Sequence, residues 1–258
     1  MLGWSINLFR IRGIAICLNF SFLLVLAYVA NEGWQSGGMP GLTWSVALFL
    51  TFFLCVVLHE LGHAFTAMRL GIGVRRIVLM IFGGVAEFTS IPRRPLHEFL
   101  ITAAGPAVNF AIAGVLWGAL GFPAGWDDGN MPATVPDLLR LVAEANIFMG
   151  LFNLLPAFPM DGGRILRAIL ATRLPYLKAT FWAATLGKVI TVLGMAVALY
   201  ALWYRLAGLF FFIFIAGESE YRAVRRREAD EARWAAYLRI QAESAPAEEP
   251  PLLSSPPG

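Results

Sequence analysis

The sequence predicts an all-α polytopic membrane protein with about six transmembrane helices and a short membrane-associated β-hairpin between the second and third of them. Three observations lead to this class. Hydrophobic residues make up 58% of the chain and charged residues only 14%, and the mean hydropathy is +0.67. The apolar residues gather into runs of a length typical of membrane spans. One further apolar run is too short to cross a bilayer and leads into a Gly-Gly pair, which is typical of a turn.

The six predicted spans are separated by short polar segments. They are 14–30, 44–70, 96–120, 138–155, 182–204 and 206–216. The first follows Arg10 and Arg12, as a secretory signal would, but it is long for the apolar core of a signal and is interpreted as a span. The last two spans are divided by very few residues.

Lysine and arginine are concentrated in alternate connections between these spans. Basic residues precede the first span and occupy 71–95 and 156–181, whereas 31–43 and 121–137 contain none. The positive-inside rule then predicts a multi-pass integral protein with both termini in the cytoplasm and the lipid bilayer as its surroundings. Because the basic residues form no continuous stripe, nucleic acid is not expected as a partner.

The chain is expected to divide into a membrane domain and a polar C-terminal part. After residue 217 the composition changes to Glu, Arg and Ala, and then to Pro, Ser and Glu. We predict a membrane domain at 1–217, a cytoplasmic helix at 218–241 and a disordered Pro/Ser-rich tail at 242–258. Cysteine occurs only at Cys17 and Cys55, both in apolar runs, so no disulfide framework is predicted.

Three ionisable residues lie inside the second predicted span. His59 and His63 are four residues apart, so in a helix both imidazoles project from one face and can bind one zinc ion. Glu60 lies beside them and can accept the proton of an attacking water. Ionisable groups within a membrane cost about 2.5 to 3.5 kcal/mol each, so a metal and a water-admitting cavity are expected around them.

A third ligand is expected where another acidic residue is placed in apolar surroundings. Pro156 and Pro159 break the fourth span, and Asp161 follows them. Irregular backbone at membrane depth is tolerated only beside protein or a wet cavity, which allows Asp161 to point at a metal. The alternative is that Asp161 caps a short helix starting near Gly162.

At this point the chain resembles the site-2 protease family of intramembrane zinc metalloproteases. The resemblance is carried by His-Glu-Leu-Gly-His at 59–63 and Asn-Leu-Leu-Pro-Ala-Phe-Pro-Met-Asp-Gly-Gly at 153–163, with Gly-Pro-Ala-Val-Asn-Phe at 105–110 and Phe-Gly-Gly at 82–84. It implies an intramembrane metalloprotease domain at 1–217 of a prokaryotic plasma membrane protein that cleaves transmembrane protein substrates. It also implies His59, His63 and Asp161 as ligands of one Zn²⁺, Glu60 as general base and acid, and Asn153 and Asn109 as polar groups near the scissile carbonyl.

Several of these residues have structural alternatives. Asn153 can bond backbone that the prolines leave unpaired, and Asn109 can join two helices through a hydrogen bond. Cys55 lies on the same helical face as His59, where a thiolate ligand is geometrically feasible, but a small apolar packing role is favoured.

The predicted hairpin suggests how a membrane substrate is held. Its strands are expected near 76–82 and 85–89, with Gly83-Gly84 between them, and one strand is expected to be an edge. An extended substrate segment added to that edge would satisfy its own backbone groups. We therefore predict substrate-binding residues at Val78, Phe82, Gly83, Gly84 and Val85. The alternative is a structural re-entrant plug.

Two other functional classes remain compatible with the sequence. A transporter or metal channel also buries His, Asp and Glu in helices broken by proline. A catalytically inactive membrane scaffold would keep the fold without turnover. The position of Glu60 between two histidines favours the zinc endopeptidase, because ion passage does not require it. No feature of the sequence sets the oligomeric state or the natural substrate.

Overall fold

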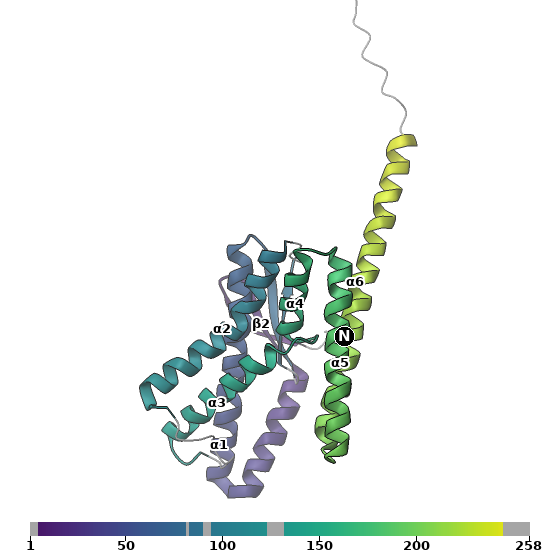
Figure 1. The fold of residues 1–258 in the computed structure, drawn as a ribbon. Helices are drawn as coiled ribbons and strands as arrows, with labels where there is room; N and C mark the ends of the chain where they lie inside the picture. Colours follow the sequence, from purple (N-terminus) through teal and green to yellow (C-terminus); the bar gives the residue numbers. More distant parts are fainter. Residues whose placement is uncertain (1–4, 81–82, 90–93, 123–131, 245–258) are drawn as a thin grey trace, which may run out of the picture.

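A computed structural model describes residues 5–80, 83–89, 94–122 and 132–244, and shows a mainly helical protein with one small sheet (Figure 1). The strands are β1 (Ser5–Ile11), β2 (Ile14–Asn19), β3 (Val74–Met80) and β4 (Gly83–Phe88). The helices are α1 (Phe20–Arg69), α2 (Pro95–Leu120), α3 (Val135–Asn153), α4 (Asp161–Ala171), α5 (Tyr176–Tyr200) and α6 (Tyr204–Ser244).

The sheet is larger than the predicted hairpin, because two of its strands come from the N-terminal segment. The strand order is β1-β2-β3-β4, with β2 and β3 parallel and the other pairs antiparallel. The prediction that 14–30 is one span was therefore wrong at its start, where 14–19 form β2. Ile14, Ala15, Ile16 and Cys17 are all buried, and a strand buried on both faces gives the same unbroken apolar run as a membrane helix.

The predicted hairpin between the second and third spans is confirmed by the antiparallel pairing of β3 with β4. Its turn was misplaced, since Gly83 and Gly84 belong to β4, and residues 81–82 lie outside the described residues. Arg76 donates to both carboxylate oxygens of Glu87 at 2.9 Å across the hairpin, which lowers the pKa of the Glu87 carboxyl. β4 lies at one edge of the sheet, as one hairpin strand was expected to.

Helix α1 is bent into two limbs, 20–36 and 39–69, which correspond to the first two predicted spans. Asn19 caps its start by accepting from the Ser21 backbone N–H at 3.0 Å, and Gly37 and Gly38 leave helical geometry at the bend. Gly38 has φ of +59°, a conformation that glycine adopts without strain. Phe22 of the first limb packs on Phe49 and Phe53 of the second, with ring centroids 5.1 and 4.7 Å apart.

Among the described residues, α1, α2 and α5 are the helices long and apolar enough to cross a membrane. The protein is therefore an integral membrane protein, although about six spans were predicted. The predicted fourth span forms α3, which carries Asp137, Arg140 and Glu144, and the sixth begins the long helix α6. The predicted fifth span, 182–204, is displaced from α5, which runs from 176 to 200.

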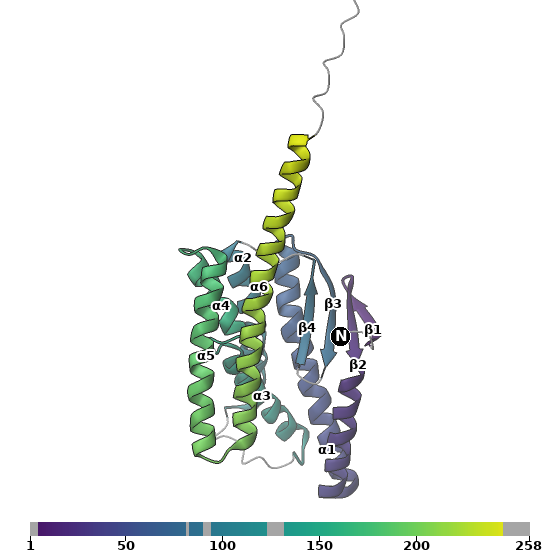
Figure 2. The ribbon, with the colours of Figure 1, turned by 90° about the vertical axis from the view of Figure 1, so that its right-hand side faces the viewer.

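Helix α6 continues without interruption through residues 217 and 218, where the membrane domain was expected to end. Figures 1 and 2 show it lying beside α5 and then extending beyond the rest of the molecule. Residues 242–244 of the predicted tail belong to this helix, and 245–258 lie outside the described residues.

The sheet packs against the second limb of α1 through one buried apolar cluster. Its members come from β2, α1 and β3: Ile14, Ile16, Val56, Val57, Leu61, Ala64, Ile77 and Leu79. Leu61 and Ala64 lie in the same two helical turns as the predicted metal ligands. The packing therefore fixes that part of α1 against the sheet.

Candidate metal centre

His59 and His63 lie one turn apart on the second limb of α1, and both are buried. Their rings meet edge to face with centroids 4.7 Å apart, and their Nε2 atoms are 3.1 Å apart. The i, i+4 spacing accounts for this, because it stacks side chains along one helix face. The two imidazoles therefore offer converging nitrogen atoms.

The opposite nitrogen of each ring is held by α2. His63 Nδ1 lies 2.7 Å from the Ile101 carbonyl oxygen, and His59 Nδ1 lies 2.5 Å from Asn109 Oδ1. Asn109 donates through Nδ2 to Asn146 Oδ1 at 2.8 Å, and Asn146 donates to the Val142 carbonyl at 2.8 Å. The Val142 carbonyl oxygen can only accept, so Asn146 turns its NH2 group toward it and its Oδ1 toward Asn109. Asn109 then turns its own NH2 group toward Asn146 and its Oδ1 toward His59. Both Nδ1 atoms then carry the proton, and both Nε2 lone pairs are free.

Asp161 completes the cluster from the other half of the chain. It is the first residue of α4, and its Oδ2 lies 3.2 Å from His59 Nε2 and 3.3 Å from His63 Nε2. The side chain does not cap α4, so the cap alternative is not observed. The loop from α3 brings it here, with Gly162 packed against the backbone of Leu154 and Leu155, where no side chain fits.

The three atoms fit a tetrahedral metal site. Two imidazole lone pairs and a carboxylate oxygen face one another at 3.1 to 3.3 Å, and within the described residues Asp161 Oδ2 has no hydrogen-bond donor. Three acceptors this close repel one another unless a cation lies between them. With zinc bonds of about 2.0 Å, tetrahedral ligand atoms are about 3.3 Å apart, which is close to the observed spacing. The donor set of two nitrogens and one oxygen leaves a fourth position open, as in catalytic zinc sites.

Gly105 of α2 keeps the space at this position open. A Cβ atom built there would lie 2.7 Å from His59 Nε2 and closer still to His63 Nε2. The same helix packs tightly on α1, since a Cβ on Gly62 would lie 2.9 Å from the Ala104 carbonyl oxygen. Glycine at 105 therefore reserves the coordination space in front of the two imidazoles.

A cavity of about 740 Å³ opens onto this cluster, and Glu60, Asn153, Gly84 and Val85 line it together with the three ligand residues. Glu60 is half-buried, and its side chain lies against Gly84, where a Cβ would approach its Cγ to 2.5 Å. Asn153 donates to the Met149 carbonyl at 3.0 Å, so it has a local structural bond while facing the cavity. The remaining walls come from β4, α2, α3, the loop before α4, α4 and α6.

Not every predicted site residue faces this cavity. Asn109 is fully buried behind His59, and Val78 is fully buried in the sheet against Ala15 and Cys17. Gly83 lies at the start of β4 without lining the cavity, and Phe82 is outside the described residues. Cys55 packs with apolar residues of α3 and is not among the residues that converge on the metal position.

Two sets of polar residues were missed at the sequence level. Asn146 is fully buried, and its place inside an apolar run was the available signal. The second set surrounds Arg167 of α4, which donates to Glu98 of α2 at 2.5 and 2.8 Å and to Glu220 of α6 at 3.0 Å. Its guanidinium also lies over the rings of Phe158 and Tyr176. This buried ion pair joins α4, which carries Asp161, to α2, whose Ile101 and Asn109 contact the two histidine rings.

Replacing Asn109 with alanine should weaken zinc binding by roughly 10- to 100-fold, the range seen when a partner of a metal-ligating histidine is removed. The physical reason is that His59 loses the acceptor that fixes its tautomer, while Asn146 loses a buried donor. Competition titration against a zinc-binding dye measures the change. Asn153→Ala is the control, because Asn153 contacts neither imidazole, and it should keep wild-type zinc affinity. Equal affinities for wild type and Asn109→Ala would contradict this role.

The fold and the site together define a class: an integral membrane protein in which a His-Glu-x-x-His helix and a distant aspartate form a buried metal centre beside a small sheet. The family model described as Peptidase family M50 matches residues 47–126 and 127–195. The chain belongs to this family.

Individual proteins similar to this chain include metalloproteases, in line with this family. A zinc metalloprotease of Methanocaldococcus jannaschii is 38% identical over 223 residues, covering 86% of this chain and 62% of the relative. Stage IV sporulation protein FB of Bacillus subtilis is 31% identical over 158 residues, covering 61% of this chain and 52% of the relative. The chain therefore spans about half to six tenths of these proteins. A solved structure of the site-2 protease from Methanocaldococcus jannaschii matches with a TM-score of 0.62 and 37% identity, covering 84% of this chain and 95% of that one.

Proposed function

We propose that this chain is an intramembrane zinc endopeptidase that hydrolyses peptide bonds within or near transmembrane segments of other proteins. The observation that carries the proposal is the convergence of His59, His63 and Asp161, with Glu60 beside them on a cavity of about 740 Å³. Family membership and the names of the relatives, which are zinc metalloproteases and a site-2 protease, support the same activity.

His59, His63 and Asp161 would hold the zinc ion, which supplies Lewis acidity for water activation and for polarising a carbonyl. Glu60 takes the proton of the attacking water and delivers it to the departing amine nitrogen. Asn153 faces the cavity and can donate to the oxygen that becomes negative, a contribution worth about 3 to 4 kcal/mol in comparable sites. Asn109 acts through His59 as a positioning residue.

The free edge of β4 holds the substrate in an extended form. A helical segment keeps its backbone closed to attack, whereas a strand paired with β4 exposes it and satisfies its N–H and C=O groups. β4 lines the cavity with Gly84 and Val85, and Gly84 touches Glu60. A substrate strand paired with β4 would therefore lie beside the Glu60 carboxylate.

The topology that fits this function has six spans: both limbs of α1, then α2, α3, α5 and the first part of α6. The basic segments at 71–95 and 156–181 then lie in the cytoplasm with both termini, and the membrane is a prokaryotic plasma membrane. The polar part of α6 would project into the cytoplasm. Residues 1–217 form the protease domain in this arrangement.

Removal of the metal tests the function directly. The chain, reconstituted in vesicles with a synthetic transmembrane peptide, should cleave it, lose all detectable cleavage after zinc chelation and regain it with one equivalent of zinc. Fragments are identified by mass spectrometry. Zinc flux into the vesicles without any peptide cleavage would indicate a channel or transporter instead. Zinc binding without cleavage or flux would indicate an inactive scaffold.

A further inference from the structure

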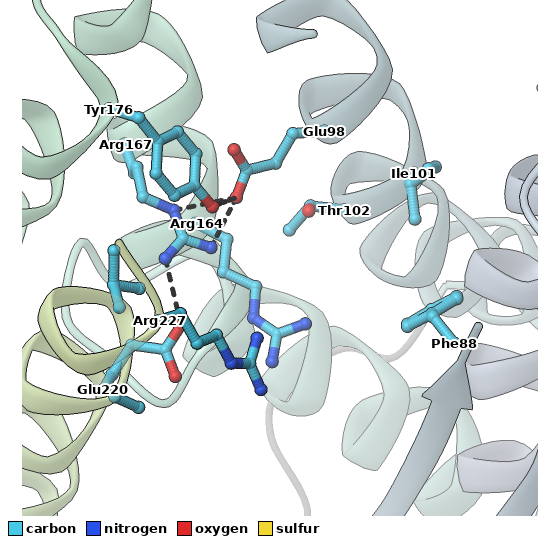
Figure 3. Close-up of a pocket in the computed structure, with 11 residues that line it drawn as sticks. Phe88, Glu98, Ile101, Thr102, Arg164, Arg167, Tyr176, Glu220 and Arg227 are labelled. Carbon is cyan, nitrogen blue, oxygen red and sulfur yellow. Dashed lines mark hydrogen bonds and ion pairs between the residues drawn. The ribbon is translucent and has the colours of Figure 1, made fainter. Parts of the chain in front are cut away.

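A second cavity of about 180 Å³ lies next to the metal cavity, among α2, α4, α6 and the start of α5 (Figure 3). The two cavities share four lining residues: Phe88, Ile101, Thr102 and Arg164. The two cavities are therefore adjacent and share part of their walls.

The charges in this second cavity are unevenly balanced. Arg167 is nearly fully buried and is bound to Glu98 and Glu220, so both carboxylates of the cavity already have a cationic partner. Arg164 and Arg227 also line the cavity, and in the described parts of the chain neither has a hydrogen bond or an ion pair. Figure 3 shows both side chains extending into the pocket. Two guanidinium groups remain available for an anion.

The position of β4 relates this cavity to the site of cleavage. Gly84 lies against Glu60 at the metal centre, and Phe88 lines the second cavity at the other end of the strand. Four residues of strand span about 13 Å. Figure 2 shows β4 running from the middle of the molecule toward the end from which α6 projects. A strand paired with β4 would thus have its cleaved bond beside Gly84 and its side chains near the arginines about four residues further on.

We propose that this cavity is a subsite for an acidic side chain of the substrate, located about four residues from the cleaved bond on the cytoplasmic side. Arg164 and Arg227 bind the Asp or Glu carboxylate, a pairing that arginine forms with fixed geometry and two parallel hydrogen bonds. The inference rests on the proposed endopeptidase function and on strand addition to β4. It assigns a specificity determinant outside the metal centre.

Charge exchange between peptide and enzyme tests the subsite. One transmembrane peptide is made with Glu, Gln or Lys at each of the positions one to eight residues on the cytoplasmic side of its cleaved bond. With the wild-type chain in zwitterionic vesicles, Glu near position four should give a kcat/KM about tenfold above Lys. Arg227→Glu should reverse this preference, because the new carboxylate repels Glu and attracts Lys. Cleavage itself should persist, since the substitution leaves the metal ligands and Glu60 untouched. Arg225→Glu is the matched control, because Arg225 lies on the same helix without lining the cavity, and it should keep the wild-type preference.

Other outcomes overturn the subsite. A rate that does not depend on charge at any of the eight positions would do so, as would a preference that Arg227→Glu leaves unchanged. A dependence on anionic lipid in the vesicles, with no dependence on peptide charge, would assign the arginines to lipid phosphate. Binding of the same peptides to Glu60→Gln, followed by fluorescence anisotropy, tests the subsite without turnover. Failure of the endopeptidase function would appear separately, as the absence of cleavage for every peptide.

Discussion

Replacing Glu60 with glutamine is expected to lower kcat for peptide cleavage by roughly a thousandfold or more while one zinc ion per chain stays bound. General acid–base catalysis contributes about 10²- to 10⁴-fold, and an amide can neither accept the proton of water nor return it to the amine. Zinc should remain because Glu60 is outside the group of His59, His63 and Asp161. Cleavage is measured with the transmembrane peptide, and zinc by elemental analysis of the purified chain.

The matched control for this variant is Glu32→Gln, which makes the same chemical change at an exposed site on the other limb of α1. It should cleave at the wild-type rate. If Glu60→Gln kept more than about a tenth of that rate, Glu60 would not be the group that transfers the proton. Loss of zinc from Glu60→Gln would instead show that this glutamate is needed to form the centre.

Replacing Gly105 with alanine is expected to eliminate zinc binding, and with it all cleavage. The added methyl group would lie 2.7 Å from His59 Nε2, in the space where the metal must bond. Neither imidazole can retreat easily, since their Nδ1 atoms are bound to Ile101 and Asn109. Zinc per chain after dialysis should fall from one to near zero.

Gly114→Ala is the control for this second variant, because Gly114 lies on the same helix and a Cβ there would meet no atom within 4 Å. Alanine favours helix over glycine by up to about 1 kcal/mol, so Gly114→Ala should keep or slightly raise the thermal stability of the metal-free protein. Gly105→Ala should lower it, because its methyl group would collide with both imidazoles. Gly114→Ala should also keep its zinc. Retention of a full equivalent of zinc by Gly105→Ala would show that the coordination space lies elsewhere.

The spacing of side chains along one helix could be predicted from sequence, and so could the approximate positions of most apolar runs. His59 and His63 depend only on helical geometry, which explains why the structure brings their Nε2 atoms together. Asp161 was also anticipated, since polar residues beside proline breaks in a membrane segment have few other roles. The antiparallel hairpin of β3 and β4 was predicted from an apolar run too short to cross a bilayer and the two glycines after it, although those glycines lie in β4 and not in the turn.

Features that depend on contacts between distant segments could not be predicted. β2 was included in a membrane span because its burial comes from β3, which follows the whole of α1. For Asn109 a helix–helix hydrogen bond was one of two interpretations, but its partner, Asn146 of α3, and its place behind His59 could not be read from the sequence. The Arg167 ion pair joins α2, α4 and α6, and no local pattern marks residues that meet across three helices. The ends of some helices were also mispredicted, because a bend or a turn determines them and hydropathy does not change there.

The parallel pairing of β2 with β3 has a consequence for biogenesis. β2 cannot pair with β3 until both limbs of α1 have been synthesised, and this parallel pairing then joins the two ends of α1. Asp161, at the start of α4, is synthesised after all four strands and after α1, α2 and α3. The three ligand atoms of the metal cluster would therefore come together only after the sheet strands and both limbs of α1 have been made.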